Sequence, residues 1–400
     1  MPASMAKMIV LLLALAPAPA WAQEAGPPIR LGMSAALSGP AQSLGNGMRL
    51  GIESYFARVN RQGGVNGREL ELIVMDDGYV PDAAARNMRA LIDGERVLAV
   101  LGNVGTPTAE VTVPIATRKR TLLFGAFTGA GLLRPSPPNR YVINYRASYA
   151  QETETMVRGL LANGVLPYQI AVFSQNDGYG DAGHAGVMRG LEAAGYDRGH
   201  LLPHGRYERN TVDVERGLLE ILESPIKPRA IIMIGTYAAC AKFIRIAHRA
   251  LPEAIYLNVS FVGSTALGNA LGADGEGVIV TQVVPHFRSA LPLVRAYRRD
   301  LAAYAPGEQP GFVSLEGYTV ARIFVEGLRR AAPAIDRERI IDALLGIRDL
   351  DIGLGTRIDY GDDVHQGSQM VWPTVIRDGR FDPFAFASLG GGRSGGVATR

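Results

Sequence analysis

Apolar and polar residues follow two periods along the chain, one typical of buried strands and one typical of helices. Short continuous apolar runs such as Leu70–Met75 and Val97–Leu101 indicate strands that are covered on both faces. The segment Gly45–Val59 places its apolar residues three or four positions apart, which indicates an amphipathic helix. Strands that alternate with helices of about 10 to 15 residues predict βαβ units around a parallel sheet.

This alternation begins again after the segment Tyr141–Arg146. The second series predicts strands at Gln169–Phe173, His200–His204, Ala230–Ile234, Ile255–Val259 and Gly277–Val283. Two long helical patterns, Leu291–Tyr304 and Phe312–Ala331, follow it. Two similar halves predict an α/β fold with two Rossmann-like lobes and a ligand cleft between them.

The expected domain boundaries follow from where the pattern restarts and from composition. One lobe is predicted to contain residues 28–145 and 284–353, and the other residues 146–283 and 354–386. Three crossings near Tyr145, Val283 and Gly353 would form the hinge between them. Residues 387–400 are rich in Gly, Ser and Arg, and we expect them to be disordered.

The first 22 residues have the three parts of a secretory signal. Lys7 supplies the positive charge, Met8–Ala16 is apolar, and Ala20-Trp21-Ala22 forms an A-x-A cleavage site. We expect cleavage after Ala22 and a periplasmic, monomeric protein. The only cysteine is Cys240, so an intrachain disulfide is excluded and no cysteine near the cleavage site could carry a lipid.

Charge and motifs argue against nucleic-acid binding and against catalysis. The formal net charge is +3 and the charged residues are scattered, without a basic block. The six histidines form no H-E-x-x-H motif, and neither a G-x-S-x-G elbow nor a phosphate-binding loop occurs. We therefore expect a protein that is not an enzyme and that needs no metal or cofactor.

The loops that follow the predicted strands are the candidate ligand site, because ligands of open parallel sheets bind beyond the carboxyl ends of the strands. Most of these loops combine glycine with Ser, Thr, Asn or Tyr, and examples are Gly102–Thr106, Gly125–Gly131 and Asn176–Gly180. Their N–H and hydroxyl groups suit an anion such as a carboxylate. Each loop taken alone is equally consistent with ordinary turn and cap residues.

Several segments occur in the order and spacing of a known family. They are Ile29–Pro40, Gly63–Arg68 followed by Leu70–Asp77, Val97–Pro107, Asp177–Gly180, Gly235–Tyr237 and Leu315–Tyr318. In these segments the chain resembles the type I periplasmic binding proteins of the branched-chain amino acid (leucine-binding) family. The resemblance extends from Ile29 to Phe384 and implies the substrate-binding protein of an ABC transporter.

The resemblance also implies a set of ligand-binding residues. In the first lobe these are Ser38, Asn103, Gly105, Thr106, Ala126 and Thr128, and in the second Tyr179, Tyr237 and Thr265. The loop after the third strand and Thr128 would hold a ligand carboxylate, and the first loop, Leu37–Gln42, would line the pocket for the ligand's side chain. The tyrosines would supply a flat apolar face with one hydroxyl. For Tyr179 and Tyr237, packing in the core is the alternative.

One departure from the family concerns the ligand's ammonium group. Amino-acid binders of this family commonly carry a glutamate in the segment that corresponds to Phe261–Ala266, where this chain has Ser264-Thr265 and no acid. A buried ammonium without a carboxylate is costly. Either Asp177 or Glu316 replaces the glutamate, or the ligand is not an α-amino acid.

Two functions remain open at this stage. The first is delivery of a small organic ligand to the permease subunits of an ABC importer by closure of the lobes. The second is a soluble ligand sensor of the same fold that acts on a signalling partner.

Overall fold

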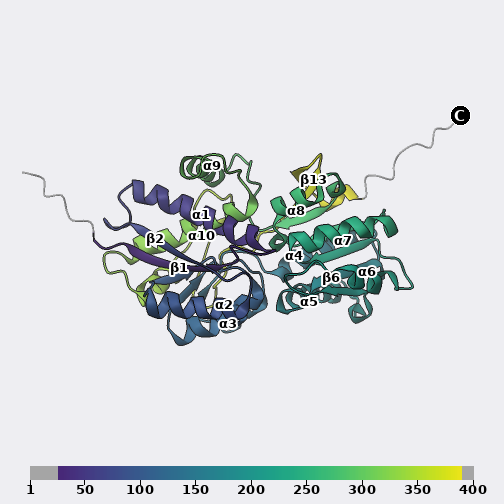
Figure 1. The fold of residues 1–400 in the computed structure, drawn as a ribbon, viewed down its shortest axis with the longest axis horizontal. Coiled ribbons are helices and arrows are strands. Elements are labelled where there is room, and N and C mark those ends of the chain that lie inside the picture. Colours follow the sequence, from purple (N-terminus) through teal and green to yellow (C-terminus); the bar gives the residue numbers. More distant parts are fainter. Residues whose placement is uncertain (1–25, 390–400) are drawn as a thin grey trace, which may run out of the picture.

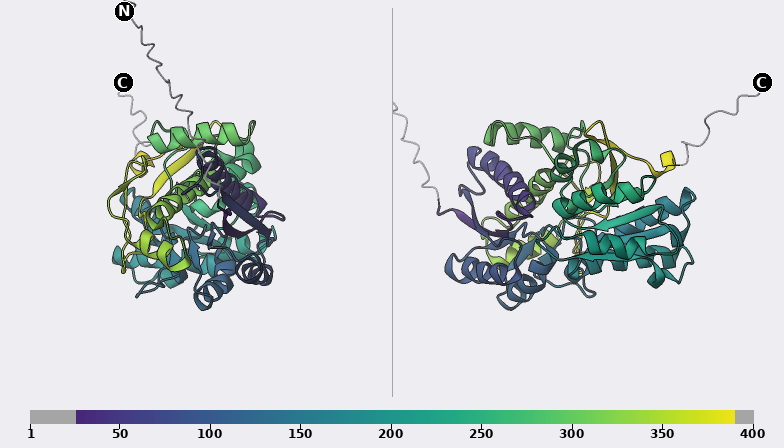
Figure 2. Two further views of the ribbon diagram at one scale, coloured as in Figure 1. Left: turned by 90° about the vertical axis from the view of Figure 1, so that its left-hand side faces the viewer. Right: turned by 45° about the vertical axis from the view of Figure 1, so that its right-hand side comes forward.

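A computed structural model describes residues 26–389, and the predicted signal segment lies outside them. The molecule consists of two α/β lobes arranged side by side along its longest axis (Figures 1 and 2). This arrangement confirms the predicted fold class. No helix within the described residues combines the length and the apolar character needed to cross a lipid bilayer.

The N-terminal lobe is built on a five-stranded sheet of order β2-β1-β3-β4-β5. Its strands are β1 (Ile29–Ala35), β2 (Leu70–Asp76), β3 (Ala99–Leu101), β4 (Leu122–Phe124) and β5 (Val142–Ile143). All neighbouring strands run parallel. Their carboxyl ends therefore meet at one edge of the sheet, where the loops of the predicted site begin.

Helices cover both faces of this sheet (Figure 1). One layer contains α1 (Gln42–Arg61), α9 (Pro292–Tyr304) and α10 (Phe312–Ala331), and the other contains α2 (Pro81–Arg89) and α3 (Thr106–Arg118), with α11 (Arg337–Leu345) packed beside α10. Successive strand residues face opposite layers: Ala99 and Leu101 belong to one core and Val100 to the other. This two-sided burial explains the continuous apolar runs in the sequence.

The C-terminal lobe contains a seven-stranded sheet of order β14-β13-β10-β9-β8-β6-β7. The strands are β6 (Ile170–Gln175), β7 (His204–Tyr207), β8 (Ala230–Ile234), β9 (Ile255–Asn258), β10 (Ile279–Gln282), β13 (Trp372–Arg377) and β14 (Arg380–Pro383). The last two run antiparallel and extend one edge.

Two helical layers also sandwich this second sheet. Ile170 and Val172 of β6 share a core with α4 (Tyr149–Ala162) and α5 (Gly178–Ala193). The intervening Ala171 and Phe173 face the layer that contains α6 (Glu215–Leu222), α7 (Tyr237–Ala250) and α8 (Ser264–Leu271). The same alternation in both lobes confirms that each is a doubly covered sheet.

Two element boundaries differ from the sequence-based expectation. The strand expected at His200–His204 begins only at His204, because residues 199–201 form a 3-10 turn. Helix α5, which the sequence pattern predicts at Asp181–Ala194, begins at Gly178, because the Asp177 side chain caps it by accepting from the Tyr179 N–H at 3.0 Å.

The third crossing between the lobes lies further along the chain than the predicted boundary at Gly353. The hairpin of β11 (Leu350–Asp351) and β12 (Arg357–Ile358) spans that position, and the Tyr360 ring lies 6.5 Å from Phe124 of the first lobe. The Ser368 N–H donates to the Tyr145 carbonyl at 2.8 Å. The chain joins the second sheet only at β13.

The start of the C-terminal tail also differs from the prediction that placed it at residue 387. Residues Phe386–Leu389 form a 3-10 turn, and the Phe386 ring lies directly over Gly159 of α4. Residues 390–400 lie outside the described residues. The apolar pair Phe384 and Phe386 anchors the chain here, since both rings pack against the core.

Candidate functional site

Two neighbouring loops at the carboxyl edge of the first sheet bring five of the predicted residues together. The loop after β3 supplies Asn103 and Gly105, the first residue of α3 is Thr106, and the loop after β4 supplies Ala126 and Thr128. The loops are joined by backbone hydrogen bonds, because the Phe127 N–H donates to the Asn103 carbonyl at 2.8 Å. The hydroxyls of Thr106 and Thr128 lie 2.7 Å apart and are fully buried.

Some polar groups of these loops are already used within the lobe. The Gly105 N–H donates to the Phe127 carbonyl at 3.2 Å, and the Asn103 Oδ1 accepts from the Ser34 N–H at 2.9 Å. The Asn103 Nδ2 has no hydrogen-bond partner among residues 26–389. The Thr106 and Thr128 hydroxyls are hydrogen-bonded to each other, and Thr128 also accepts from the Ala130 N–H at 3.3 Å. The group of these loops that remains for a ligand is therefore the Asn103 amide nitrogen.

Tyr179 of α5 faces these loops from the second lobe. Its ring centroid lies 4.6 Å from that of Phe261 and 5.2 Å from that of Tyr149, and its hydroxyl donates to the Gly235 carbonyl at 3.3 Å. The ring is fully buried. Tyr179 thus lies at the junction of the lobes, while its part in ligand binding stays a prediction.

The sequence-based site missed two aromatic residues that hold the lobes together. Phe261 reaches from the second lobe to within 5.2 Å of the Phe127 ring and 6.1 Å of the Tyr79 ring, measured between centroids. Tyr79 has a φ of +62° and lies over Gly105, where a Cβ would approach its ring to 2.2 Å. Only glycine fits at position 105. The glycine at this position is the one feature of the sequence that could have indicated the contact with Tyr79.

Tyr79 also joins the lobes through polar contacts. Its hydroxyl accepts from the Gln175 amide at 3.3 Å, and the Arg209 guanidinium lies 6.0 Å from its ring centroid. The neighbouring Gly78 carbonyl accepts from Asn210 at 3.2 Å. The lobes are therefore closed on each other in this structure.

The other three predicted residues lie away from this centre. Ser38 and Thr265 are exposed, and Tyr237 is half-buried beside Gly263. The Ser264 hydroxyl is paired with the side chain of Gln282 inside the second lobe. In the segment Phe261–Ala266, the residue that faces the centre is Phe261.

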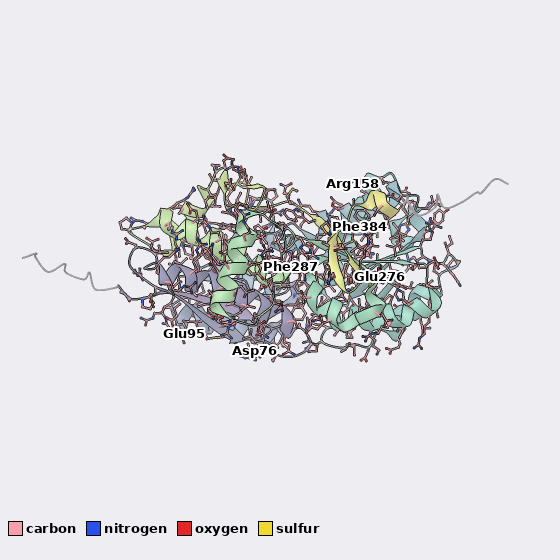
Figure 3. The ribbon with its side chains drawn as sticks, turned by 90° about the horizontal axis from the view of Figure 1, so that it is seen from above. Asp76, Glu95, Arg158, Glu276, Phe287 and Phe384 are labelled. Atoms are coloured by element: carbon pink, nitrogen blue, oxygen red, sulfur yellow. The ribbon has the colours of Figure 1, made fainter. Side chains whose placement is uncertain are left out.

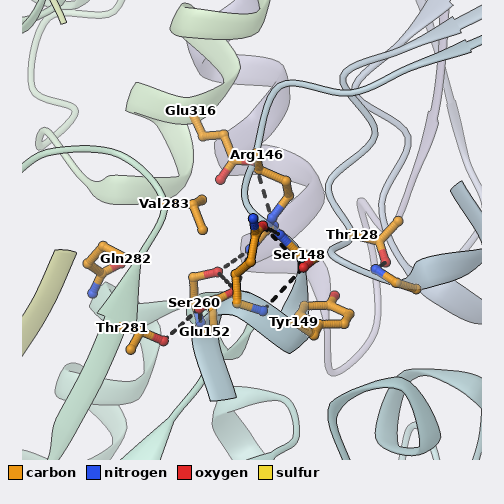
Figure 4. Close-up of polar contacts among 12 residues, drawn as sticks. Thr128, Arg146, Ser148, Tyr149, Glu152, Ser260, Thr281, Gln282, Val283 and Glu316 are labelled. Carbon is orange, nitrogen blue, oxygen red and sulfur yellow. Dashed lines mark hydrogen bonds and ion pairs between the residues drawn. The ribbon is translucent and has the colours of Figure 1, made fainter. Parts of the chain in front are cut away.

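A buried arginine forms the polar part of the centre (Figure 4). Arg146 lies in the first crossing and is 1% exposed. Its guanidinium lies 4.7 Å from the ring centroid of Phe127 and 5.8 Å from that of Tyr149. Cation–π contacts of this kind strengthen when water is excluded.

Arg146 lies between carboxylates of both lobes. Its Nη2 contacts the Ser260 hydroxyl and lies 3.4 Å from Glu152 of the second lobe, and its Nη1 lies 3.6 Å from Glu316 of the first. Glu152 also accepts from the Ser260 N–H at 2.7 Å and from the Thr281 hydroxyl at 2.6 Å. Glu152 is therefore saturated with donors.

The two acids considered as substitutes for the family's glutamate both have basic neighbours. Asp177 lies 3.2 Å from the Arg209 guanidinium and caps α5. Burial raises the pKa of Glu316 to about 7, although Arg146 beside it lowers that pKa. Neither acid is positioned as an unpaired carboxylate that could receive an ammonium group.

Several buried polar atoms at the centre have no hydrogen-bond partner among residues 26–389. They are Nε and Nη1 of Arg146, the Tyr149 hydroxyl and Nδ2 of Asn103, and each can donate. Within the same residues, no three His, Cys, Asp or Glu side chains form a group that could hold a metal ion. The centre is thus rich in donors and walled by aromatic rings.

The model of the periplasmic binding protein family matches residues 28–380. The chain belongs to this family. Its members are substrate-binding proteins and not enzymes, which agrees with the absence of catalytic motifs from the sequence.

Two curated relatives share about a quarter of their residues with this chain. The leucine-, isoleucine-, valine-, threonine- and alanine-binding protein of Pseudomonas aeruginosa is 23% identical, over 79% of this chain and 82% of its own. The Leu/Ile/Val-binding protein homolog 7 of Brucella abortus is 25% identical, over 90% of this chain and 91% of its own.

Two solved structures differ widely in their sequence identity to this chain. A possible leucine/isoleucine/valine-binding protein from Rhodopirellula baltica is 46% identical, with a TM-score of 0.89 over 91% of this chain and 98% of its own. A branched chain amino acid ABC transporter protein from Thermus thermophilus with bound valine is 18% identical, with a TM-score of 0.78 over 89% and 95%. The latter likeness shows the fold alone.

Proposed function

We propose that this protein is the periplasmic substrate-binding component of an ABC importer and that its ligand is a small organic carboxylate held between the lobes. The observation that carries the choice of ligand is the set of buried donors without partners at the centre. Export by a signal cleaved after Ala22, a monomeric state and delivery to permease subunits belong to the same proposal.

The donors favour an anion with several acceptor lone pairs. Leaving a buried donor unpaired costs about 1–3 kcal/mol, so groups such as Nε of Arg146 and the Tyr149 hydroxyl gain from a ligand that accepts from them. A carboxylate can accept several hydrogen bonds, and those from a guanidinium are among the strongest.

The surrounding acids argue against a ligand ammonium group. Glu152 is saturated with donors, Asp177 has Arg209 beside it, and Glu316 lies next to Arg146 with a pKa of about 7. An ammonium group placed here would have to displace one of these arginines. A ligand with a carboxylate and a flat apolar body suits the rings of Phe127, Tyr149 and Phe261.

Binding requires the lobes to separate first. Thr106, Thr128, Tyr149, Tyr179 and Phe261 are all 0% exposed, so the closed centre leaves no water-sized space beside them. A ligand that enters the open form and contacts both lobes would favour reclosure around it. The closed state without ligand competes with binding and lowers the apparent affinity.

The test is a ligand screen by thermal shift, followed by calorimetry on the hits. The mature chain is compared with benzoate-like acids, aliphatic carboxylates, their amides, and leucine, isoleucine and valine. We expect carboxylates without an ammonium group to raise the melting temperature, because a ligand bound only to the folded state must stabilise it. A shift produced by branched-chain amino acids alone would contradict the proposed ligand class.

Tyr149→Phe sharpens the test, because the hydroxyl it removes has no partner in the structure. The unliganded variant should be as stable as the parent or slightly more so, and it should bind the carboxylate about tenfold more weakly. The matched control is Tyr256→Phe, which removes a buried hydroxyl that donates to the Leu251 carbonyl within the second lobe. The control should lose stability and keep its affinity.

A further inference from the structure

A cavity lies at one edge of the seam between the lobes, apart from the aromatic centre. Its volume is about 530 Å³, which lies within the usual range for small-molecule sites. Its walls come from α8 and the β13–β14 turn of the second lobe, from α9 and the α9–α10 loop of the first, and from the second crossing. The cavity therefore exists only while the lobes keep this relative position.

Three arginines from different segments line this cavity: Arg288, Arg298 and Arg380. None of the three side chains forms an ion pair with a residue between 26 and 389, and no Asp or Glu lines the cavity. Nearby surface arginines differ in this respect, because Arg245 pairs with Asp274 and Arg299 with Asp300. Three like charges around one cavity repel one another, and an anion between them relieves that repulsion.

Aromatic rings form the apolar side of the same cavity. Phe287 of the second crossing lies at the seam (Figure 3), and its ring centroid is 4.9 Å from that of Phe312. The Phe381 ring of β14 is 5.8 Å from Phe312, and the Arg288 guanidinium lies 5.7 Å from the Phe287 ring centroid. The cavity thus combines guanidinium groups with exposed ring surface, which suits a flat anion.

We propose that this cavity is a second binding site, for an organic anion with two or three carboxylates on a flat apolar body. The site is separate from the centre at Arg146 and does not depend on the identity of the ligand bound there. Since its arginines come from both lobes and from the crossing between them, an anion bound here holds the lobes closed. The second site would then influence capture and release at the first.

The experiment is calorimetric titration of the full mature chain with three probes that separate charge from shape: benzene-1,3,5-tricarboxylate, citrate and benzoate. We expect the aromatic tricarboxylate to bind most tightly, citrate more weakly, and benzoate at least tenfold more weakly than the tricarboxylate. Binding should weaken in 0.5 M salt, because the arginines are partly exposed. Because benzoate is also a candidate ligand of the centre, the titration is repeated in Tyr149→Phe, and benzoate that binds this variant as tightly as the tricarboxylate does would overturn the proposal.

Two single substitutions test whether the tricarboxylate binds in this cavity. Arg298→Gln, which changes the half-buried arginine of the cavity, should weaken the tricarboxylate at least fivefold. Arg295→Gln is the matched control, because Arg295 is exposed on the same helix and does not line the cavity. Equal losses in both variants would show only a general effect of charge and would overturn the site.

A third variant separates this site from the centre. Tyr149→Phe should leave binding of the tricarboxylate unchanged, whereas it weakens the ligand of the proposed transport function. A parallel loss in Tyr149→Phe would mean that the tricarboxylate binds at the centre, and the second site would be rejected. Failure of the carboxylate screen at the centre leaves the prediction for Arg298→Gln intact.

Discussion

Arginine occurs in two contrasting settings where the lobes meet. At the centre, Arg146 is 1% exposed and has a carboxylate from each lobe within 3.6 Å. At the edge, Arg288, Arg298 and Arg380 surround a cavity that no acid lines. A guanidinium removed from water needs charged or hydrogen-bonding partners, whereas one that keeps its hydration can remain unpaired at little cost.

The comparison separates what holds the lobes together from what is available to bind. Most polar groups of the residues at the centre are already paired within the protein. The few donors without a partner suit only a ligand that accepts hydrogen bonds. The edge has spare charge and open space but contributes little to closure by itself. Each region can therefore be altered with a different expected outcome.

The largest effect is expected from Arg146→Met. Removing this cation leaves Glu152 and Glu316 buried without it, and breaking a buried pair in this way costs about 3–5 kcal/mol. Urea denaturation of the unliganded protein would measure the loss. Arg298→Gln at the edge should change the unfolding free energy by no more than about 0.5 kcal/mol. Equal losses of unfolding free energy in the two variants would show that the arginines of the centre and of the edge do not differ in their contribution to stability.

The next effect concerns the pH dependence of stability, and it arises from Glu316. Its pKa in the folded protein is about 7, against an ordinary value of 4.5, because burial outweighs the attraction of Arg146 and Arg134. The folded state therefore binds this proton more tightly than the unfolded chain does. The stabilisation is complete below pH 4.5 and is lost as the pH rises through 7.

Glu316→Gln should remove this loss, since a neutral amide does not titrate. The variant should be more stable than the parent by about 3 kcal/mol at pH 8 and by less than about 1 kcal/mol at pH 5. Chemical denaturation of both proteins across this range would measure the difference. A constant difference at every pH would show that Glu316 is ionised throughout.

Much of the fold could be predicted from the sequence, because two-sided burial of parallel strands leaves a direct trace. Runs such as Val97–Leu101 and Ala230–Ile234 are apolar at every position, and both were placed within two residues of the observed strands. The third crossing was misplaced at Gly353. The short strands β11 and β12 carry little periodic signal, and contacts such as Tyr360 with Phe124 are remote in sequence.

The candidate site was predictable where it depends on strand ends and not where it depends on contacts between lobes. Asn103, Gly105, Thr106, Ala126 and Thr128 follow two adjacent strands, so topology alone brings them together. The contact of Phe261 with Phe127 joins residues from opposite lobes, and no local pattern reports it. Arg146 was passed over because its burial depends on acids that lie on α4 and α10.

The smallest effect is expected from Ser38→Ala, which tests whether the first loop belongs to the centre. Ser38 was included because the family resemblance places that loop at the ligand's side chain, but the residue is exposed in the closed structure. The variant should change the unfolding free energy by no more than about 0.5 kcal/mol, since exposed substitutions rarely do more. Its affinity for the ligand found in the screen should equal that of the parent by calorimetry. A loss of affinity as large as that of Tyr149→Phe would mean that the ligand also contacts the first loop. The binding site would then extend from the rings of Tyr79 and Phe261 to Ser38.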